Sequence, residues 1–135
     1  MYKCNSQQPA VMFGYGGFSV STLPVYRSDI PAWLEIGGIW VTVSMRGGAE
    51  YGEAWHKAGM LEKKQNVFDD FVAVAEYLIE KGYTSPQKLG ILGGSNGGLL
   101  VAVVAQQRPD YLLSAYGASL AVHAPRAPLA GMRPG

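Results

Sequence analysis

With 135 residues, the chain is long enough for one domain with a sizeable core, and 48% of it is hydrophobic. Eleven basic residues against ten acidic ones give a net charge of +1, so there is no electrostatic reason to expect a nucleic acid or an anionic membrane as partner. The single cysteine, Cys4, excludes an intrachain disulfide. The sequence shows neither a signal peptide nor an apolar run of membrane-spanning length, so we expect a cytoplasmic protein.

Short apolar segments and glycine-rich turns make up the first part of the chain. Residues 10–18, AVMFGYGGF, predict a buried strand that runs into a glycine-rich turn. Residues 37–48, GGIWVTVSMRGG, predict a second strand, whose β-branched and aromatic residues indicate that both of its faces are covered. Residues 49–64 are polar and punctuated by glycine, which is typical of a loop with one or two helical turns.

A long amphipathic helix is predicted between Asn66 and Gly82. Asn66 is a suitable N-cap and Gly82 is a suitable stop signal. Between them, apolar residues recur at spacings of three and four and so fall on one face. The residues of this face are Phe68, Phe71, Val72, Ala75, Leu78 and Ile79.

The alternation of strand and helix continues after this helix. Residues 84–87 form a turn, and residues 88–94, KLGILGG, predict a third short strand. Residues 96–107 predict a helix that ends before Pro109 and is apolar nearly all round, so we expect it to be deeply buried. Residues 111–118 are consistent with a fourth strand. This alternation argues for an α/β fold with a mostly parallel sheet and flanking helices.

The composition changes near the end of the chain. Residues 118–135 hold five alanines and three prolines but no acidic residue. We therefore divide the chain into a globular unit, residues 1–117, and a tail, residues 118–135, that we expect to be a linker or disordered.

Residues 89–100, LGILGGSNGGLL, surround one serine with glycines, and three interpretations compete: a phosphate cradle, a turn without chemical role, and a nucleophile on a sharp corner. A P-loop needs a lysine after its glycines, and none follows here; the fingerprint G-x-G-x-x-G is absent as well. Residues 93–97, GGSNG, match G-x-S-x-G between a strand and a helix, which favours the nucleophile over the structural turn.

The chemistry of a serine nucleophile explains the glycines around it. The hydroxyl of Ser95 becomes useful only on a tight, strained turn that exposes it at the end of a strand. Gly93 and Gly97 must then be small, because side chains there would clash with the adjoining strand and helix. The backbone N–H of Asn96 would point at the developing oxyanion, which the start of the helix also favours. This chemistry requires no metal and no cofactor.

Four segments together resemble the prolyl oligopeptidase family of serine peptidases. They are FGYGGF (13–18), MRGGAEYGEAWHKAG (45–59), KKQNVFDDFVAVAEYLIEKGYTSPQKL (63–89) and GGSNGGLLVAVVAQQRPD (93–110). The resemblance implies an α/β-hydrolase domain, which we expect to be partial here, with a sheet that is incomplete at its C-terminal side.

The resemblance also implies roles for four residues. Ser95 corresponds to the nucleophile, and Asn96 supplies one oxyanion-hole donor through its backbone N–H. Tyr15 corresponds to the residue whose hydroxyl is the second donor, and Phe18 to part of the wall of a proline-accepting pocket; for both, a role in packing stays open. His56 precedes the serine, unlike the base of an α/β-hydrolase triad, so we expect a packed or hydrogen-bonded loop histidine.

The triad acid and histidine of the family come well after the serine. Here Asp110 is the only acidic residue after Ser95 and His123 is the only histidine. Asp110 would lie at the far end of a helix about 18 Å long, at 1.5 Å per residue. A strand at 111–117 could lead His123 back toward Ser95, although no acid would orient it. The β-propeller that precedes the hydrolase domain in the family has no counterpart in this sequence, so we expect a truncated piece.

We therefore expect a piece of a serine-type peptidase that hydrolyses peptides after proline through an acyl-enzyme, without a cofactor. One alternative is a non-catalytic scaffold fragment, whose open sheet edge would favour self-association. The other is a different α/β-hydrolase, such as an esterase or an acylaminoacyl peptidase.

Overall fold

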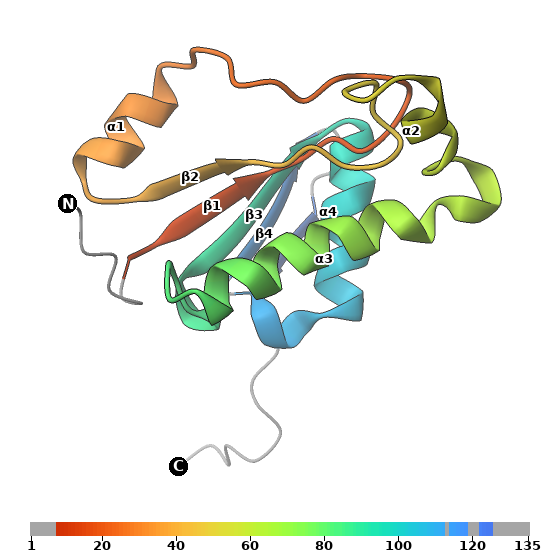
Figure 1. Ribbon diagram of the computed structural model, residues 1–135. Helices are drawn as coiled ribbons and strands as arrows, with labels where there is room; N and C mark the ends of the chain where they lie inside the picture. The colour runs from red at the N-terminus through yellow and green to blue at the C-terminus, as the bar shows by residue number, and fades with distance from the viewer. Residues whose placement is uncertain (1–7, 113, 119–121, 126–135) are drawn as a thin grey trace.

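The computed structural model describes residues 8–112, 114–118 and 122–125, which form one five-stranded sheet with flanking helices (Figure 1). The strand order is β2-β1-β3-β4-β5. The first four strands of this order are parallel, and β5 is antiparallel to β4, which confirms the mostly parallel α/β sheet. The strands are β1 (Ala10–Phe13), β2 (Ile39–Thr42), β3 (Leu89–Gly94), β4 (Ser114–Ala118) and β5 (Val122–Pro125).

The central pair of strands brings two glycine-rich turns to the same edge of the sheet. In β1 and β3, Ala10 lies opposite Leu89 and Phe13 lies opposite Leu92. Because the strands are parallel and in this register, the turns that follow both of them leave the sheet side by side. Ligands of open parallel sheets bind at this edge, beyond the carboxyl ends of the strands.

One face of the sheet is covered by two helices, α3 (Gln65–Glu80) and α4 (Asn96–Gln107). Alternate residues of the central strands are buried on this side, as the period of two in a strand requires. Phe71 of α3 and Leu100 of α4 meet at Gly14, where a Cβ would lie 2.7 Å from the Phe71 ring and 2.9 Å from Leu100. The core therefore lies directly behind the turn that follows β1. Its buried hydrophobic residues include Ala10, Met12, Met45, Val67, Phe68, Phe71, Leu89, Ile91, Leu100 and Val101.

The first turn of α3 differs from the prediction. The helix begins at Gln65, so Asn66 lies inside it and is not its N-cap. The 3₁₀ helix Leu61–Lys63 (η1) leads directly into α3, and Lys64 keeps helical angles (φ −59°, ψ −29°), which leaves no extended residue to act as a cap. The Asn66 amide instead donates to the Ala58 carbonyl oxygen at 2.8 Å. At the other end, Gly82 has φ +74° and terminates the helix as predicted.

Strand β2 and helix α4 are more exposed than the sequence predicts. All four residues of β2 are half-buried, because β2 is the outer strand of the described sheet. On one face Ile39 and Val41 pack against the core, and the short helix α1 (Asp29–Glu35) also contacts the strand. The Trp33 indole of α1 donates to the Ile39 carbonyl oxygen at 2.9 Å. Both faces of this strand are therefore covered only in part, and less completely than expected. In α4, Leu99 is 46% exposed, so this helix is buried on one side and not all round.

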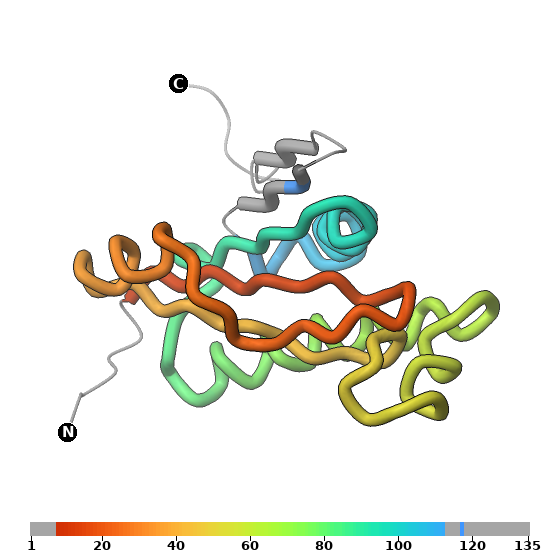
Figure 2. The backbone as a smooth tube through the Cα atoms, turned by 90° about the horizontal axis from the view of Figure 1, so that it is seen from above, coloured from red at the N-terminus to blue at the C-terminus, as the bar shows by residue number. Residues whose placement is uncertain are grey.

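Long connections surround the carboxyl edge of the sheet. After β1 the chain reverses and runs back beside the strand to reach α1 (Figure 2). The segment between β2 and α3 carries α2 (Glu53–Lys57), in line with the helical turns expected for residues 49–64. Two 3₁₀ helices complete the connections: η2 (Pro86–Lys88) directly precedes β3, and η3 (Pro109–Tyr111) follows α4.

The tail contributes one strand to the described structure. Residues Val122–Pro125 form the strand β5, which pairs with β4. This strand was not expected, because the sequence predicts a linker or disorder there. Residues 119–121 and 126–135, the rest of that tail, lie outside the described residues. Among the helices that the structure describes, none is long and apolar enough to cross a membrane.

Candidate active site

Ser95 occupies a strained turn between β3 and α4. Its φ of +53° and ψ of −117° lie in a region that residues with a side chain rarely adopt. The side chain is exposed, and within the described residues it makes no capping bond to the helix that it precedes. A residue held in this way raises the energy of the fold by about 1–3 kcal/mol, and such strain clusters at functional sites. The strained turn between a strand and a helix is as the sequence predicts, and the role of Ser95 as a nucleophile stays a prediction.

The two glycines of the motif are required by the backbone around them. A Cβ on Gly93 would collide with the carbonyl oxygen of Gly97. A Cβ on Gly97 would lie 2.5 Å from the carbonyl oxygen of Gly14, in the turn after β1. Both contacts are with backbone atoms, which cannot rotate aside as a flexible side chain can. The predicted reason for these glycines is therefore correct, and Gly97 also faces the neighbouring strand's turn.

The structure brings the predicted residues Asn96 and Tyr15 together. The Asn96 side-chain amide donates to the Tyr15 carbonyl oxygen at 2.7 Å, across 81 positions of sequence. Asn96 is the first residue of α4, and the first N–H groups of a helix have no partner within it. Its backbone N–H directly follows Ser95 in the chain, and its role as an oxyanion donor stays a prediction. Tyr15 is half-buried in the adjoining turn, and the role of its hydroxyl stays a prediction.

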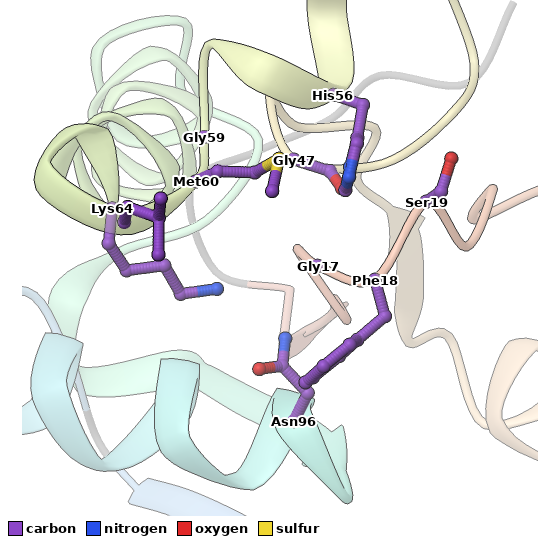
Figure 3. A pocket seen from close by; sticks show the side chains of 10 residues that line it. Gly17, Phe18, Ser19, Gly47, His56, Gly59, Met60, Lys64 and Asn96 are labelled. Carbon is purple, nitrogen blue, oxygen red and sulfur yellow. The ribbon is translucent and has the colours of Figure 1, made fainter. Parts of the chain in front are cut away.

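Phe18 lies on the wall of a cavity of about 480 Å³ beside Asn96 (Figure 3). It is 75% exposed, and both Phe18 and Ser19 have positive φ values, of 51° and 56°. The other residues that line the cavity are Gly17, Ser19, Gly47, His56, Gly59, Met60, Leu61 and Lys64. The mostly apolar wall next to Asn96 is consistent with a pocket for an apolar side chain.

His56 is hydrogen-bonded, as expected, but it lies in helix α2 and not in a loop. Its Nδ1 lies 2.7 Å from the carbonyl oxygen of Gly47. A carbonyl oxygen only accepts, so Nδ1 carries the proton in this contact. The same carbonyl oxygen accepts a bond from the backbone N–H of Ser19 at 3.3 Å. The segment 45–59, which had no chemical assignment from the sequence, thus supports the loop that carries Phe18.

An ion pair between Arg46 and Asp70 fixes the same segment to α3. The Asp70 carboxylate accepts from the Arg46 backbone N–H at 2.9 Å and from its guanidinium Nη2 at 2.6 Å. The hydrogen bond to Asp70 raises the pKa of Arg46. Sequence reasoning missed this pair, because the two residues are 24 positions apart and no local pattern links them.

Lys64 is a second residue that the sequence reasoning missed. Its Nζ donates to the carbonyl oxygen of Gly16 at 2.7 Å, in the loop that follows β1. Burial lowers the pKa of the Lys64 amine below its ordinary value. In sequence it is one of two adjacent lysines, and nothing there distinguishes it from Lys63.

Asp110 is not placed to serve Ser95. It lies in η3, beyond the far end of α4, where its carboxylate is 3.4 Å from the Arg108 guanidinium. The backbone of His123 lies in β5 opposite Tyr116, two strands away from β3. Over the described residues, no group of three histidine, cysteine or acidic side chains could hold a metal ion.

Comparison with known proteins adds independent information. The family model described as "Prolyl oligopeptidase family" matches residues 24–120. The chain is 44% identical over 108 residues to a prolyl endopeptidase of Elizabethkingia miricola, which covers 80% of this chain and 15% of that protein. It is 50% identical over 103 residues to a prolyl endopeptidase of Dictyostelium discoideum, covering 76% of this chain and 14% of that one.

A solved structure of a prolyl oligopeptidase is also similar to this chain. Prolyl oligopeptidase B from Galerina marginata, bound to a 25mer macrocyclization substrate, aligns with a TM-score of 0.80 and 41% identity. The alignment covers 85% of this chain and 17% of that one. The expected partial α/β-hydrolase fold is thereby confirmed, and the chain spans about 15% of the length of the relatives that it matches.

Proposed function

Because this chain belongs to the prolyl oligopeptidase family of serine peptidases, we propose that it supplies the nucleophile and the oxyanion hole for cleavage of peptides after proline. The observation that carries the proposal is the strained, exposed turn at Ser95. A conformation of that kind is maintained against an energetic penalty, and it aims one hydroxyl out of the carboxyl edge of a parallel sheet.

In the proposed mechanism the hydroxyl oxygen of Ser95 attacks the scissile carbonyl carbon, and a general base takes the hydroxyl proton. Negative charge then develops on the substrate oxygen, where the Asn96 backbone N–H and the Tyr15 hydroxyl donate to it. One such donor contributes about 3 kcal/mol to lowering the barrier. Collapse of the tetrahedral intermediate breaks the peptide bond and leaves an acyl group on Ser95, and water attacks this ester to release the second product.

His56 is not the proposed general base. The His56 imidazole is bound to the Gly47 carbonyl oxygen and lies across the cavity from Asn96 (Figure 3). Within the described residues no ion pair joins an acidic side chain to a histidine. Asp110, the one acidic residue after Ser95, is paired with Arg108 beyond the far end of α4. We therefore expect the 135-residue chain alone to hydrolyse peptides slowly, and a chain without any turnover would fit the scaffold alternative.

Specificity for proline is proposed to arise at the cavity beside Phe18. Proline presents a compact apolar ring, and an apolar wall next to the oxyanion donors would hold that ring beside the scissile bond. The peptide is thus the proposed partner of this site.

A cytoplasmic location and self-association through an open sheet edge also remain part of the proposal. Sedimentation of the purified chain over a range of concentrations tests the association.

The test combines a covalent probe with turnover. A fluorophosphonate reports an activated serine, and a fluorogenic peptide with proline before the leaving group reports hydrolysis. We expect Ser95→Ala to abolish labelling, while Ser28→Ala, at an exposed serine that also precedes a helix, leaves it unchanged. Labelling that survives Ser95→Ala overturns the assignment of the nucleophile. Equal turnover of proline peptides and simple esters would favour another kind of α/β-hydrolase.

A further inference from the structure

The loop that carries Tyr15 is held by side chains from two other elements. Asn96 of α4 donates from its side-chain amide to the Tyr15 carbonyl oxygen at 2.7 Å. Lys64, at the start of α3, donates from Nζ to the Gly16 carbonyl oxygen at 2.7 Å. Two successive peptide groups of the loop are therefore each bound by a side chain that comes from a different helix.

These two bonds fix the backbone at the most flexible residue of the loop. The Tyr15 and Gly16 carbonyls belong to the peptide groups on either side of the Gly16 Cα, so holding both determines the φ and ψ of Gly16. Gly16 has a positive φ of +67°, and a Cβ there would collide with Val67. Without the two bonds, a glycine would have many other conformations available to it. The Tyr15 Cα is bonded directly to the first of these two peptide groups, so the position from which its side chain extends depends on how firmly they are held.

The placement of Lys64 is unusual for a surface lysine. Its side chain lines the cavity beside Asn96, and its ammonium group contacts a backbone carbonyl (Figure 3). Removing an ammonium group from water is unfavourable, and burial lowers the pKa of this one accordingly. The neighbouring Lys63 is exposed to solvent. A cation retained at such a position indicates a local role that its neighbour does not have.

We propose that Lys64 is a positioning residue for the oxyanion hole: through the Gly16 carbonyl it fixes the loop that aims the Tyr15 hydroxyl at the substrate oxygen. The inference rests on the proposed function, because it takes the Tyr15 hydroxyl as an oxyanion donor. It adds a residue to the site and gives a function to the start of α3, which the catalytic scheme itself does not use.

Two other roles of Lys64 would give different experimental signatures. If its positive charge stabilised the oxyanion through space, removing it would slow the reaction whether or not the Tyr15 hydroxyl is present. If it only stabilised the fold, its removal would lower the melting temperature without a specific effect on the reaction. Positioning through the loop requires instead that the effect of Lys64 depends on the Tyr15 hydroxyl.

A double-mutant cycle on the full chain separates these roles. The rate constant for fluorophosphonate labelling of Ser95 is measured for the wild type, Lys64→Met, Tyr15→Phe and the double variant. We expect Lys64→Met to slow labelling roughly tenfold in the wild type, since small misplacements of reacting groups have effects of at least that size. In the Tyr15→Phe background the same change should have less than about a twofold effect, since no hydroxyl remains to position. Lys63→Met serves as the matched control and should leave the rate unchanged.

A tenfold effect of Lys64→Met that persists in Tyr15→Phe overturns positioning in favour of direct charge. Lys64→Arg keeps a cationic donor of similar reach, so we expect it to restore part of the rate.

A readout independent of reactivity separates failure of this inference from failure of the proposed function. The ¹³C chemical shift of the Gly16 carbonyl should change in Lys64→Met and stay the same in Lys63→Met. Amide exchange over residues 14–19 should quicken, while exchange in β3 and α4 stays as it was. If the wild type does not react with the probe, the proposed function fails, and the carbonyl shift still decides whether Lys64 holds the loop. An unchanged Gly16 carbonyl overturns the inference outright.

Discussion

Replacing Ser95 with glycine should stabilise the chain while removing the proposed nucleophile. Ser95 has a φ of +53°, where a residue with a Cβ is strained by about 1–3 kcal/mol. Glycine removes that strain but adds about 0.4–1 kcal/mol of unfolded-state entropy. The serine side chain is exposed and within the described residues makes no capping bond, so little else is lost. The expected net gain in the free energy of unfolding is about 1–2 kcal/mol.

The assay is urea unfolding of the purified chain, followed by circular dichroism. Ser95→Ala keeps the Cβ and therefore the strain, so its free energy of unfolding should stay within about 0.5 kcal/mol of the wild type. Ser28 gives a matched comparison, because it is also exposed and precedes a helix without a side-chain cap, but its φ is −66°. Ser28→Gly should destabilise the chain. If Ser95→Gly is no more stable than Ser95→Ala, the turn is not strained and the reasoning is refuted.

Three further predictions concern the supports of the site. Gly97→Ala should destabilise the chain by about 1 kcal/mol in urea unfolding, because the clash with the Gly14 carbonyl exceeds the gain in helix propensity, and fluorophosphonate labelling should slow. Asp70→Ala should cost about 2 kcal/mol of unfolding free energy, because it removes charged hydrogen bonds to Arg46 in a partly exposed pair. Lys64 should make stability rise with pH between its lowered folded-state pKa and its ordinary value of 10.5, because only the unfolded chain keeps the proton there.

The controls for these predictions come from neighbouring residues. Asp69→Ala removes an exposed carboxylate next to Asp70 and should change the unfolding free energy by less than about 0.5 kcal/mol. Equal losses from the two substitutions would contradict the importance of the ion pair. Urea unfolding at several pH values should show the rise in the wild type and in Lys63→Met but not in Lys64→Met. An unchanged free energy of unfolding in Gly97→Ala would contradict the predicted clash, because the Gly14 and Gly97 backbones could then separate without cost.

The helices and strands and the strained turn at Ser95 were predictable because their signals are local. The periodicity from Phe68 to Ile79 determines the buried face of α3, and G-x-S-x-G between a strand and a helix determines the turn at Ser95. The same holds for Gly82, where a glycine ends a helix by adopting a positive φ. In each case one short stretch of sequence contains both the cause and the consequence.

Predictions failed where a distant or preceding segment decided the outcome. Asn66 has the side chain of an N-cap, but η1 already holds the preceding residues in helical angles, so the helix begins earlier. The composition of β2 indicates full burial, yet its place at the outside of the described sheet leaves all four of its residues only half-buried. Lys64 and Arg46 act on partners 48 and 24 positions away, and no spacing rule connects such residues.

The bond from the Asn96 amide to the Tyr15 carbonyl has a consequence for the order in which the chain is made. Its two partners lie 81 positions apart, so during synthesis at roughly 5–20 residues per second the Tyr15 loop precedes Asn96 by about 4–16 s. Strand β1 also waits for β3, its central partner, over nearly the same interval. The nascent chain thus carries Tyr15, one of the two proposed oxyanion donors, well before it carries Ser95, the proposed nucleophile. The proposed site can therefore form only after Asn96 has been added, when most of α4 and the strands β4 and β5 are still to be made.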